Sequence, residues 1–330
     1  MDLSVDYLGL RLAHPFMPGA SPLGDELRSV RALEDAGASA IVMRSLFEEQ
    51  LAQEQMLAHQ ATDYSREMFP EARSFFPEPE EYRLGPDAYL DQLRRAKAAV
   101  AIPVIGSLNG TTRAGWIEHA RLIEQAGADA LELNVYAVAS DAELDGSLLE
   151  QRTLELVRAV KDTVRIPVAV KLSPFYTSLP NFARALERAG ADGLVLFNRL
   201  FQPDIDVEAL DVKRELHLSD SSELPLRLRW LAILSPQLRV PLAASGGVHV
   251  AVDALRVLMA GATVVQVVSA LLEHGPGQLA RLRSEVVRWM EDHEYESMAQ
   301  LRGSMNLATC PDPSAYQRAN YIFLLQSWRG

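Results

Sequence analysis

Polar residues end most of the apolar runs in this chain, at positions where packing alone has no use for them. Lys171, inside Val-Ala-Val-Lys-Leu-Ser-Pro, is the most informative, because a buried ammonium is costly unless it meets an anion or a strong acceptor. Contact with a ligand is one interpretation, and an ion pair with Glu132 inside the fold is the structural alternative. The full set is Ser21, Arg44, Ser45, Ser107, Asn109, Glu132, Asn134, Lys171, Ser173, Asn198, Arg199, Ser245, Gln266 and Ser269.

The stretch from Pro241 to Leu272 predicts an anion site. One apolar run in it ends in Ser245-Gly246-Gly247, where two residues without Cβ allow a tight turn and close approach to a ligand. The next run ends in Ser269-Ala270, just before a helical segment. If the two runs are neighbouring strands, their backbone N–H groups converge on one point, as phosphate sites require. A turn without a ligand is the simpler alternative.

Two recurring phrases indicate the elements that position these residues. A helix end with glycine and then an apolar run occurs at 34–43, 124–133, 187–196 and 258–267, and openings such as Ile-Pro-Val begin at 102, 166 and 240. Together with the first apolar run they predict eight strands, at 15–20, 39–44, 102–107, 129–134, 166–172, 192–198, 239–244 and 263–268. Helices are expected at 26–36, 113–126, 148–162, 180–189, 224–234 and 249–260.

Apolar strands that alternate with helices are typical of a parallel sheet covered on both faces. Eight such units predict the α/β class and a (β/α)8 TIM barrel. An open, doubly wound sheet is the alternative, but the glycine fingerprint for dinucleotides does not follow the first strand.

We expect a single domain over residues 1–330, with a core at about 13–293 and a C-terminal helical tail at 294–330 that ends in RANYIFLLQSW. Residues 3–12 predict a small hairpin before the barrel. Insertions are expected after strands 2 and 6, at 45–85 and 199–223, on the face where such barrels carry their active sites.

Composition narrows the function classes. The 330 residues are 48% hydrophobic, and 44 acidic against 32 basic residues give a net charge of -12, which disfavours nucleic-acid binding. Cys310 is the single cysteine, so one chain cannot build a disulfide, a cysteine-only metal site or an iron–sulfur cluster. We expect no metal, no membrane span and a reducing, cytoplasmic location.

The ordered series of motifs resembles the FMN-dependent dihydroorotate dehydrogenase family, in particular its bacterial dihydroorotate dehydrogenase-like branch. The similarity covers about residues 3–300 and rests on HPFMPGAS, LELN, IPVAVKLSP, the asparagine of LVLFN, ASGGV and GATVVQVVSALLEHGP. It implies FMN as cofactor, with Lys171 near the N1/O2 edge of the flavin ring. It also implies that the phosphate binds Gly246, Gly247, Ser269 and Ala270, and that the flavin contacts Ala20, Ser21, Asn109 and Asn134.

The same resemblance implies a small, anionic substrate, dihydroorotate/orotate or a related compound, bound by Arg44, Asn134 and Asn198. Arg44 stands where the family has a lysine. After Asn134 the chain departs from the family pattern, because Ala137 takes the place of the usual cysteine base and Tyr136 lies beside it. Residues 45–85 also lack the family's Asn-x-x-Gly-x-x-Asn segment. We therefore predict Tyr136, Lys171 and Arg44 as catalytic residues, with a packed aromatic as the alternative role for Tyr136.

The predicted function is an FMN-dependent oxidoreductase that acts on CH–CH groups in pyrimidine biosynthesis. Two alternatives are a Schiff-base lyase or aldolase with Lys171 as nucleophile, and a non-catalytic flavin-binding subunit. We expect a homodimer, and a redox partner subunit is compatible with the sequence if it brings its own cysteines.

Overall fold

The computed structural model describes residues 1–48, 86–110, 112–135, 138–199, 202–213, 217–317 and 326–327. Eight parallel strands form one sheet in the order β3-β12-β11-β8-β7-β6-β5-β4. Their bounds are β3 Phe16–Pro18, β4 Ile41–Phe47, β5 Val104–Asn109, β6 Ala130–Asn134, β7 Val168–Leu172, β8 Gly193–Leu196, β11 Leu242–Ser245 and β12 Val264–Val267. The sheet curves until its two end strands meet, where the Ser39 amide, just before β4, donates to the Phe16 carbonyl of β3 at 3.1 Å. The predicted (β/α)8 barrel is therefore confirmed.

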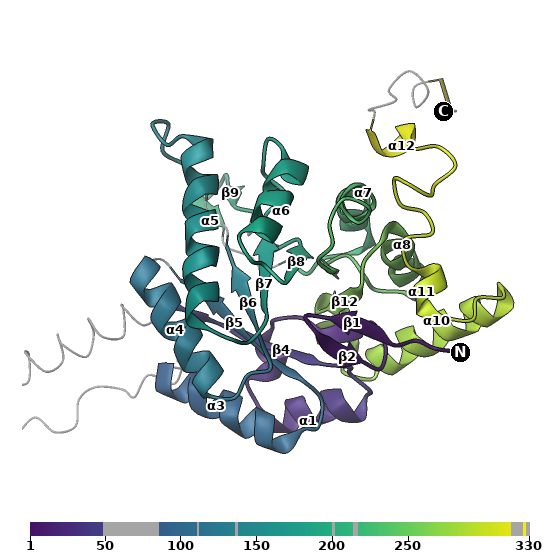
Figure 1. Cartoon of the computed structure of the whole chain (residues 1–330), viewed down its shortest axis with the longest axis horizontal. Coiled ribbons are helices and arrows are strands. Elements are labelled where there is room, and N and C mark those ends of the chain that lie inside the picture. Colours follow the sequence, from purple (N-terminus) through teal and green to yellow (C-terminus); the bar gives the residue numbers. More distant parts are fainter. Residues whose placement is uncertain are drawn as a thin grey trace, which may run out of the picture.

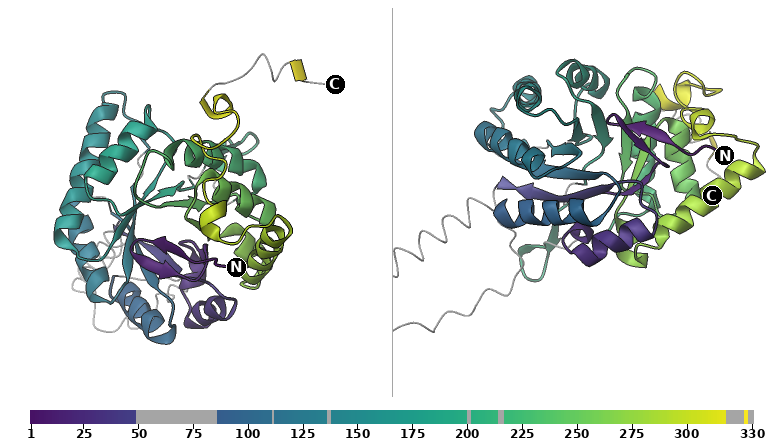
Figure 2. Two further views of the ribbon diagram at one scale, coloured as in Figure 1. Left: turned by 45° about the vertical axis from the view of Figure 1, so that its right-hand side comes forward. Right: turned by 60° about the horizontal axis from the view of Figure 1, so that its bottom comes forward.

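Helices surround the strands (Figure 1, Figure 2). They bury one apolar face against the sheet, as in α6, where Phe182, Ala183 and Leu186 are fully enclosed. Their bounds are α1 Leu27–Asp35, α3 Pro86–Ala99, α4 Arg113–Gln125, α5 Gly146–Thr163, α6 Leu179–Arg188, α7 Leu224–Leu234, α8 Ala251–Ala260, α9 Ser269–His274 and α10 Gln278–Asp292.

Each predicted strand and helix is present, with bounds that differ by a few residues. One difference concerns the openings of the type Ile-Pro-Val, which were predicted to be the first residues of their strands. The carbonyl of Pro241 accepts a hydrogen bond from Leu194, but the strand itself begins at Leu242, so proline precedes the strand. Helix α3 was not among the predicted helices, although the sequence Gly85-Pro86 at its start is a helix-start signal that marks the end of the long insertion.

A two-stranded hairpin closes the amino-terminal end of the barrel. Strands β1 (Val5–Tyr7) and β2 (Leu10–Leu12) pair antiparallel, and their turn places Leu8 and Gly9 at φ 53° and 70°. Leu8 is buried against Gly193 at the start of β8, where a Cβ would lie 2.8 Å from the leucine side chain. The predicted hairpin is thus confirmed and serves as a hydrophobic plug.

Glutamates of the recurring phrase clamp the amino-terminal rim. Glu34 of α1 accepts hydrogen bonds from the Ala101 and Ile102 amides just before β5, at 2.7 and 3.3 Å. Glu124 binds residues 165 and 166 before β7 in the same way, and Glu187 binds residues 239 and 240 before β11. Leu258 holds the equivalent place in the fourth phrase, and its carbonyl instead accepts from the Gly303 amide. The three glutamates thus bind the segments before β5, β7 and β11, so that each contact recurs with every second strand–helix unit.

The predicted insertions begin at the carboxyl-terminal ends of β4 and β8, on the opposite rim. Of the first, residues 49–85 lie outside the described part. The second carries a hairpin of β9 (Asp204–Asp206) and β10 (Asp211–Lys213), then a short 3-10 helix, η2 (Ser221–Glu223).

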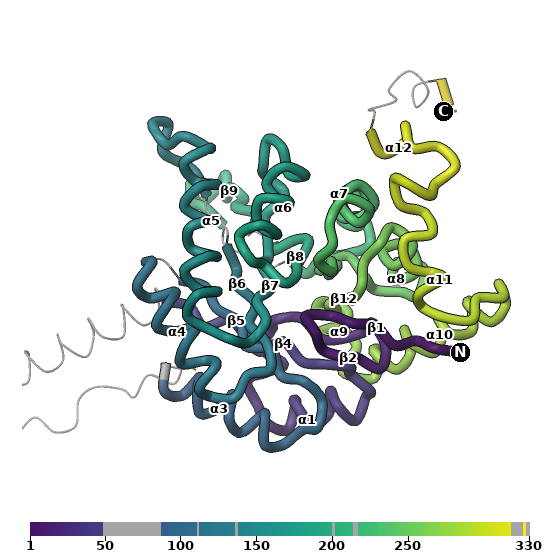
Figure 3. Tube along the Cα trace, in the orientation of Figure 1, coloured from purple at the N-terminus to yellow at the C-terminus, as the bar shows by residue number. Residues whose placement is uncertain are grey.

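The tail runs back along the amino-terminal end of the barrel. It contains α11 (Met298–Leu301) and α12 (Ser314–Gln317), and Met298 donates to the Asp2 carbonyl beside the N-terminus at 2.8 Å (Figure 3). Most of RANYIFLLQSW lies outside the described residues, so the helix predicted for this end of the tail stays a prediction. Within the described part, no helix is both long and apolar enough to cross a membrane.

Candidate active site

A buried ion pair occupies the barrel interior near its carboxyl-terminal end. Lys171 of β7 donates to Glu132 of β6 at 3.1 Å, and their side chains are 6% and 1% exposed. Gln266 of β12 completes a ring: its Nε2 donates to Glu132 Oε2 at 2.6 Å and its Oε1 accepts from Lys171 Nζ at 3.4 Å. The pairing that the sequence allowed as the structural alternative for Lys171 is therefore present. It fixes the ammonium in one position at the end of the strand.

Tyr7 of the plug extends towards the same charges. Its hydroxyl is buried with no hydrogen-bond partner, and burial, followed by the nearby Glu132 carboxylate, raises the pKa of Tyr7 well above its usual value. The space below Lys171 is thus closed to water, and the polar groups of the barrel act from its carboxyl-terminal end.

An amide held by two hydroxyls forms the second part of the site. Asn134 at the end of β6 donates through Nδ2 to Ser45 Oγ at 2.6 Å and to Ser107 Oγ at 3.0 Å, and the two hydroxyls are 2.8 Å apart. Both donor hydrogens of the amide are used, so its orientation is fixed. Its Oδ1 is buried and has no partner. An unpaired buried acceptor costs free energy, which a ligand N–H would recover.

A buried tyrosine supports this group from behind. The Tyr89 hydroxyl of α3 donates to the Ser107 carbonyl at 3.1 Å and accepts from the Ser107 amide at 3.0 Å. Burial raises the pKa of Tyr89 far above its usual value. Tyr89 therefore holds the backbone of β5 in place and remains neutral.

Arg44 lies at the rim on β4, half-exposed, and is held by a carboxylate. Its Nη1 donates to Asp25 Oδ2 at 2.9 Å, and the side chain of Asp25 is only 6% exposed. Burial raises the pKa of Asp25, while the hydrogen bond and charge of Arg44 oppose that rise. The pair holds a half-exposed guanidinium on β4, and a guanidinium in such a position can bind an anion.

The double glycine forms a concave turn after β11. Gly246 and Gly247 have φ of +86° and +79°, so a side chain would be strained at both. Ser269, after the neighbouring β12, bonds to Ser219 of the second insertion at 2.8 Å between hydroxyls, and the Gly247 amide donates to Ser219 Oγ at 3.3 Å. Two strand ends and one insertion therefore meet here, as the sequence predicted for the strands.

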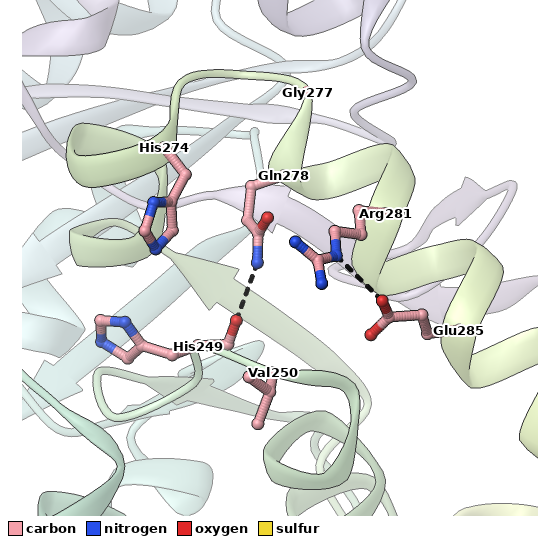
Figure 4. Close-up of a pocket in the computed structure, with 7 residues that line it drawn as sticks. All are labelled: His249, Val250, His274, Gly277, Gln278, Arg281 and Glu285. Atoms are coloured by element: carbon pink, nitrogen blue, oxygen red, sulfur yellow. Dashed lines mark hydrogen bonds and ion pairs between the residues drawn. The ribbon is translucent and has the colours of Figure 1, made fainter.

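A polar cavity lies just outside this turn (Figure 4). It measures about 350 Å3, and Gln278 crosses it to donate to the His249 carbonyl at 2.9 Å. Its lining residues come from the segment after Gly247, the end of α9 and the start of α10, and are His249, Val250, His274, Gly277, Gln278, Arg281 and Glu285. The cavity does not include the ion pair or the Asn134 group.

The remaining predicted residues lie around the same rim. Asn198 follows β8 and is partly exposed, and its backbone N–H donates to the Leu172 carbonyl at 2.7 Å. Ala20 is partly exposed after β3, Ser21 and Ala270 are buried, and Asn109 is the partly exposed last residue of β5. Tyr136 and Ala137 lie outside the described residues, so the prediction for Tyr136 remains untested.

Two weaker candidates for an acid or base lie after β7. Tyr176 stacks on Phe182 with ring centres 4.5 Å apart, and burial raises the pKa of Tyr176 to about 12. The hydroxyl of Ser173 accepts from the Phe175 amide at 3.4 Å. A tyrosine with a raised pKa keeps its proton, so Tyr176 is a poor base.

Sequence reasoning missed the partners that come from outside the strands. These are Asp25, Tyr89, Ser219 and Arg227. Arg227 gave a usable signal, because it lies three residues after Leu224 and four before Leu231, on the buried face of α7. The other three carry no local pattern, since each meets its partner over a long sequence separation.

Comparisons with known proteins identify a family and several relatives of this chain. Residues 83–290 match the family model described as dihydroorotate dehydrogenase. The chain is 32% identical over 234 residues to the catalytic subunit of dihydroorotate dehydrogenase B (NAD(+)) from Geobacter sp. (strain M21), covering 68% of this chain and 75% of that protein. The same subunit from Thermoplasma acidophilum is 26% identical over 92% of this chain and 98% of its own length. The NAD-dependent dihydropyrimidine dehydrogenase subunit PreA of Escherichia coli (strain K12) is 25% identical, covering 92% and 77%.

Proposed function

Because this chain belongs to the dihydroorotate dehydrogenase family, whose members are oxidoreductases acting on CH–CH groups, we propose that it is an FMN-dependent enzyme that transfers a hydride between flavin N5 and a small anionic substrate. One observation carries the proposal. The side-chain amide of Asn134, on β6, has a buried oxygen without a partner, and it lies beside the paired ammonium of Lys171 on the neighbouring strand β7. A ligand with an N–H group and an electron-accepting ring matches both.

The residues present fit FMN in three respects. The Oδ1 of Asn134 needs a donor, and a flavin ring has an N–H group to give. Lys171 provides a fixed cation that would offset the negative charge gained by the ring on reduction. The turn at Gly246 and Gly247, next to Ser269 and Ala270, would hold a phosphate through backbone N–H groups, with the Gly247 N–H exchanging its 3.3 Å bond to Ser219 Oγ for the ligand. We assign Ala20, Ser21 and Asn109 to the same cofactor.

The substrate would bind at the mouth of the barrel. Arg44 would contact an anionic group, and Asn134 and Asn198 would position the rest of the molecule. The names of the relatives suggest dihydropyrimidine rings, including dihydroorotate. With alanine at position 137, we assign proton transfer to Tyr136, which favours reduction of a substrate because a phenol donates a proton more readily than it removes one from carbon.

The ion pair counts against a Schiff-base lyase, because an ammonium bound to a carboxylate has no free electron pair with which to attack a carbonyl. Borohydride reduction in the presence of carbonyl compounds tests that alternative directly, since trapping on Lys171 would support it.

We also propose a homodimer and a redox partner subunit in the cytoplasm. Two relatives are themselves named as subunits. The second insertion exposes apolar side chains that water does not favour, namely Ile205, Val207, Leu210 and Val212, with Phe175 on the loop after β7. Light scattering should give twice the chain mass, and Leu210→Glu should lower it to one chain.

The deciding experiment is anaerobic titration of the purified protein after incubation with FMN. Dihydroorotate, dihydrouracil and reduced nicotinamides are added separately while the visible absorbance of the flavin is followed. We expect bleaching by one of the cyclic donors, which runs the favoured reduction in reverse, and a loss of about 10- to 100-fold in that rate for Arg44→Gln with flavin binding retained. Arg11→Gln, on the plug and exposed, is the matched control. A protein that takes up no FMN would refute the proposal, and bound flavin that no donor reduces would favour the binding subunit.

A further inference from the structure

A buried guanidinium lies behind the double-glycine turn. Arg227 of α7 is only 4% exposed. Its Nε donates to the Ser245 carbonyl at 2.5 Å and its Nη1 donates to the Glu223 carbonyl at 2.8 Å. The side chain thus joins the last residue of β11 to the residue before α7, and so fixes where the turn begins.

The guanidinium also lies against the turn itself. A Cβ built on Gly246 would be 2.7 Å from Arg227 Nη2 and 3.2 Å from its Cζ and Nε. Such distances leave no room for a side chain, so Gly246 is required here by the arginine as well as by its positive φ. The cation and the turn are therefore in direct contact, with no layer of apolar atoms between them.

In the salt-bridge cluster that contains Arg227, guanidinium groups outnumber carboxylates. Glu223 is 3.4 Å from Arg227 Nη2 and 3.1 Å from Arg199 Nη2, so two guanidinium groups share one carboxylate. Two further acids lie nearby. Asp220 is exposed at the start of η2, and buried Asp253 is bound to the amides of residues 249 and 250. Burial lowers the pKa of Arg227, and the Glu223 carboxylate opposes that effect. A buried guanidinium that must share its carboxylate with a second guanidinium costs free energy, and an anion in the turn would offset that cost.

We propose that Arg227 is a specificity-determining residue that makes this turn select a phosphorylated ligand over the same ligand without phosphate. The arginine acts from behind, by its charge and by fixing the Ser245 carbonyl, and does not itself touch the ligand. The inference rests on the proposed function, since it takes FMN as the ligand. It concerns a residue of this chain and not the backbone N–H groups that would contact the phosphate.

The test compares FMN with riboflavin, which has the same ring and no phosphate. Flavin-free protein is titrated with each, and the quenching of flavin fluorescence gives the two dissociation constants. Arg227→Met should weaken FMN by about 10- to 100-fold and riboflavin by less than about 2-fold. Arg227→Lys should recover part of the loss, because it keeps the charge but not the fork of donors. Arg229→Met is the matched control on the same helix, where the arginine is exposed and bonds to the Tyr316 carbonyl.

A second variant gives an effect of opposite sign. Glu223→Gln removes the shared carboxylate and leaves its backbone carbonyl, so it should tighten FMN several-fold and leave riboflavin unchanged. If Arg227 had only a structural role, Arg227→Met would lower the affinity for both flavins equally, and Glu223→Gln would raise the affinity for neither. Either result overturns the inference.

Inorganic phosphate separates this inference from the proposed function. If the wild-type protein binds no flavin, the proposed function fails, and thermal unfolding with phosphate then decides. Phosphate stabilisation of the wild type that is lost in Arg227→Met supports the role of the arginine. Equal stabilisation of both proteins, or of neither, overturns it.

Discussion

Replacing Glu132 by leucine should destabilise the protein strongly. The carboxylate and Lys171 are buried, 3.1 Å apart, with side chains 1% and 6% exposed. In Glu132→Leu the Lys171 ammonium loses the carboxylate and keeps the neutral acceptor Gln266 Oε1 at 3.4 Å. An unpaired buried charge costs about 3–5 kcal/mol, a large part of a typical folding free energy of about 5–15 kcal/mol. Lys171→Met should cost a similar amount, because it leaves the carboxylate unpaired.

The double variant separates the charge from the packing. Glu132→Leu/Lys171→Met removes both charges and leaves the Gln266 amide short of its partner, which costs about 1–3 kcal/mol. We expect the double variant to lose less free energy of unfolding than either single variant, and several kcal/mol less than the sum of the two single losses.

The assay is urea unfolding followed by circular dichroism, without flavin, so that only folding is measured. Arg281→Ala/Glu285→Ala removes an exposed pair at 2.9 Å and should cost below about 0.5 kcal/mol. If Glu132→Leu costs less than about 1 kcal/mol, or the single losses simply add, the site is not dry and the reasoning is wrong.

Three further predictions concern His14, Asp253 and Ser107. Burial, followed by the charge of Arg283, lowers the pKa of His14 to about 4, and its Nδ1 accepts from the Phe16 amide. The neutral His14 therefore contributes its full stabilisation above pH 6.5, and this contribution is lost as pH falls towards 4. Between pH 7.5 and 4.5 the free energy of unfolding should drop by about 2–3 kcal/mol for this reason. In urea unfolding, His14→Asn should lack this part of the pH-dependent drop. Asp253→Asn should cost about 1–3 kcal/mol in the same assay, because the carboxylate accepts from two backbone amides and, at 2.6 Å, from Ser221; an unchanged midpoint would contradict that role. Ser107→Ala frees one side of the Asn134 amide and should weaken FMN about 5-fold by fluorescence titration, whereas unchanged affinity would mean that the amide does not bind the flavin.

The fold could be predicted because the strands are nearly all apolar and the phrases that separate them recur. Lys171, Glu132 and Asn134 could be found in the same way, since a polar residue stands out in a buried strand. Asp25 and Ser219 could not, because each lies in an irregular segment and is recruited by a partner that only the closed barrel brings near. The partners of a strand residue thus depend on how the barrel closes, which the spacing of apolar residues does not record.

The glutamate clamps of the amino-terminal rim bear on how such a chain can change over time. Among the described residues, Glu34, Glu124 and Glu187 tie alternate helix-to-strand joints, those before β5, β7 and β11, and the tail substitutes for the clamp at Leu258. The rim that carries these clamps is therefore separate from the rim that carries the predicted site. Substitutions at the carboxyl-terminal ends, such as alanine at position 137, leave the clamps untouched. A barrel built in this way can change the residues of one rim without first losing its fold.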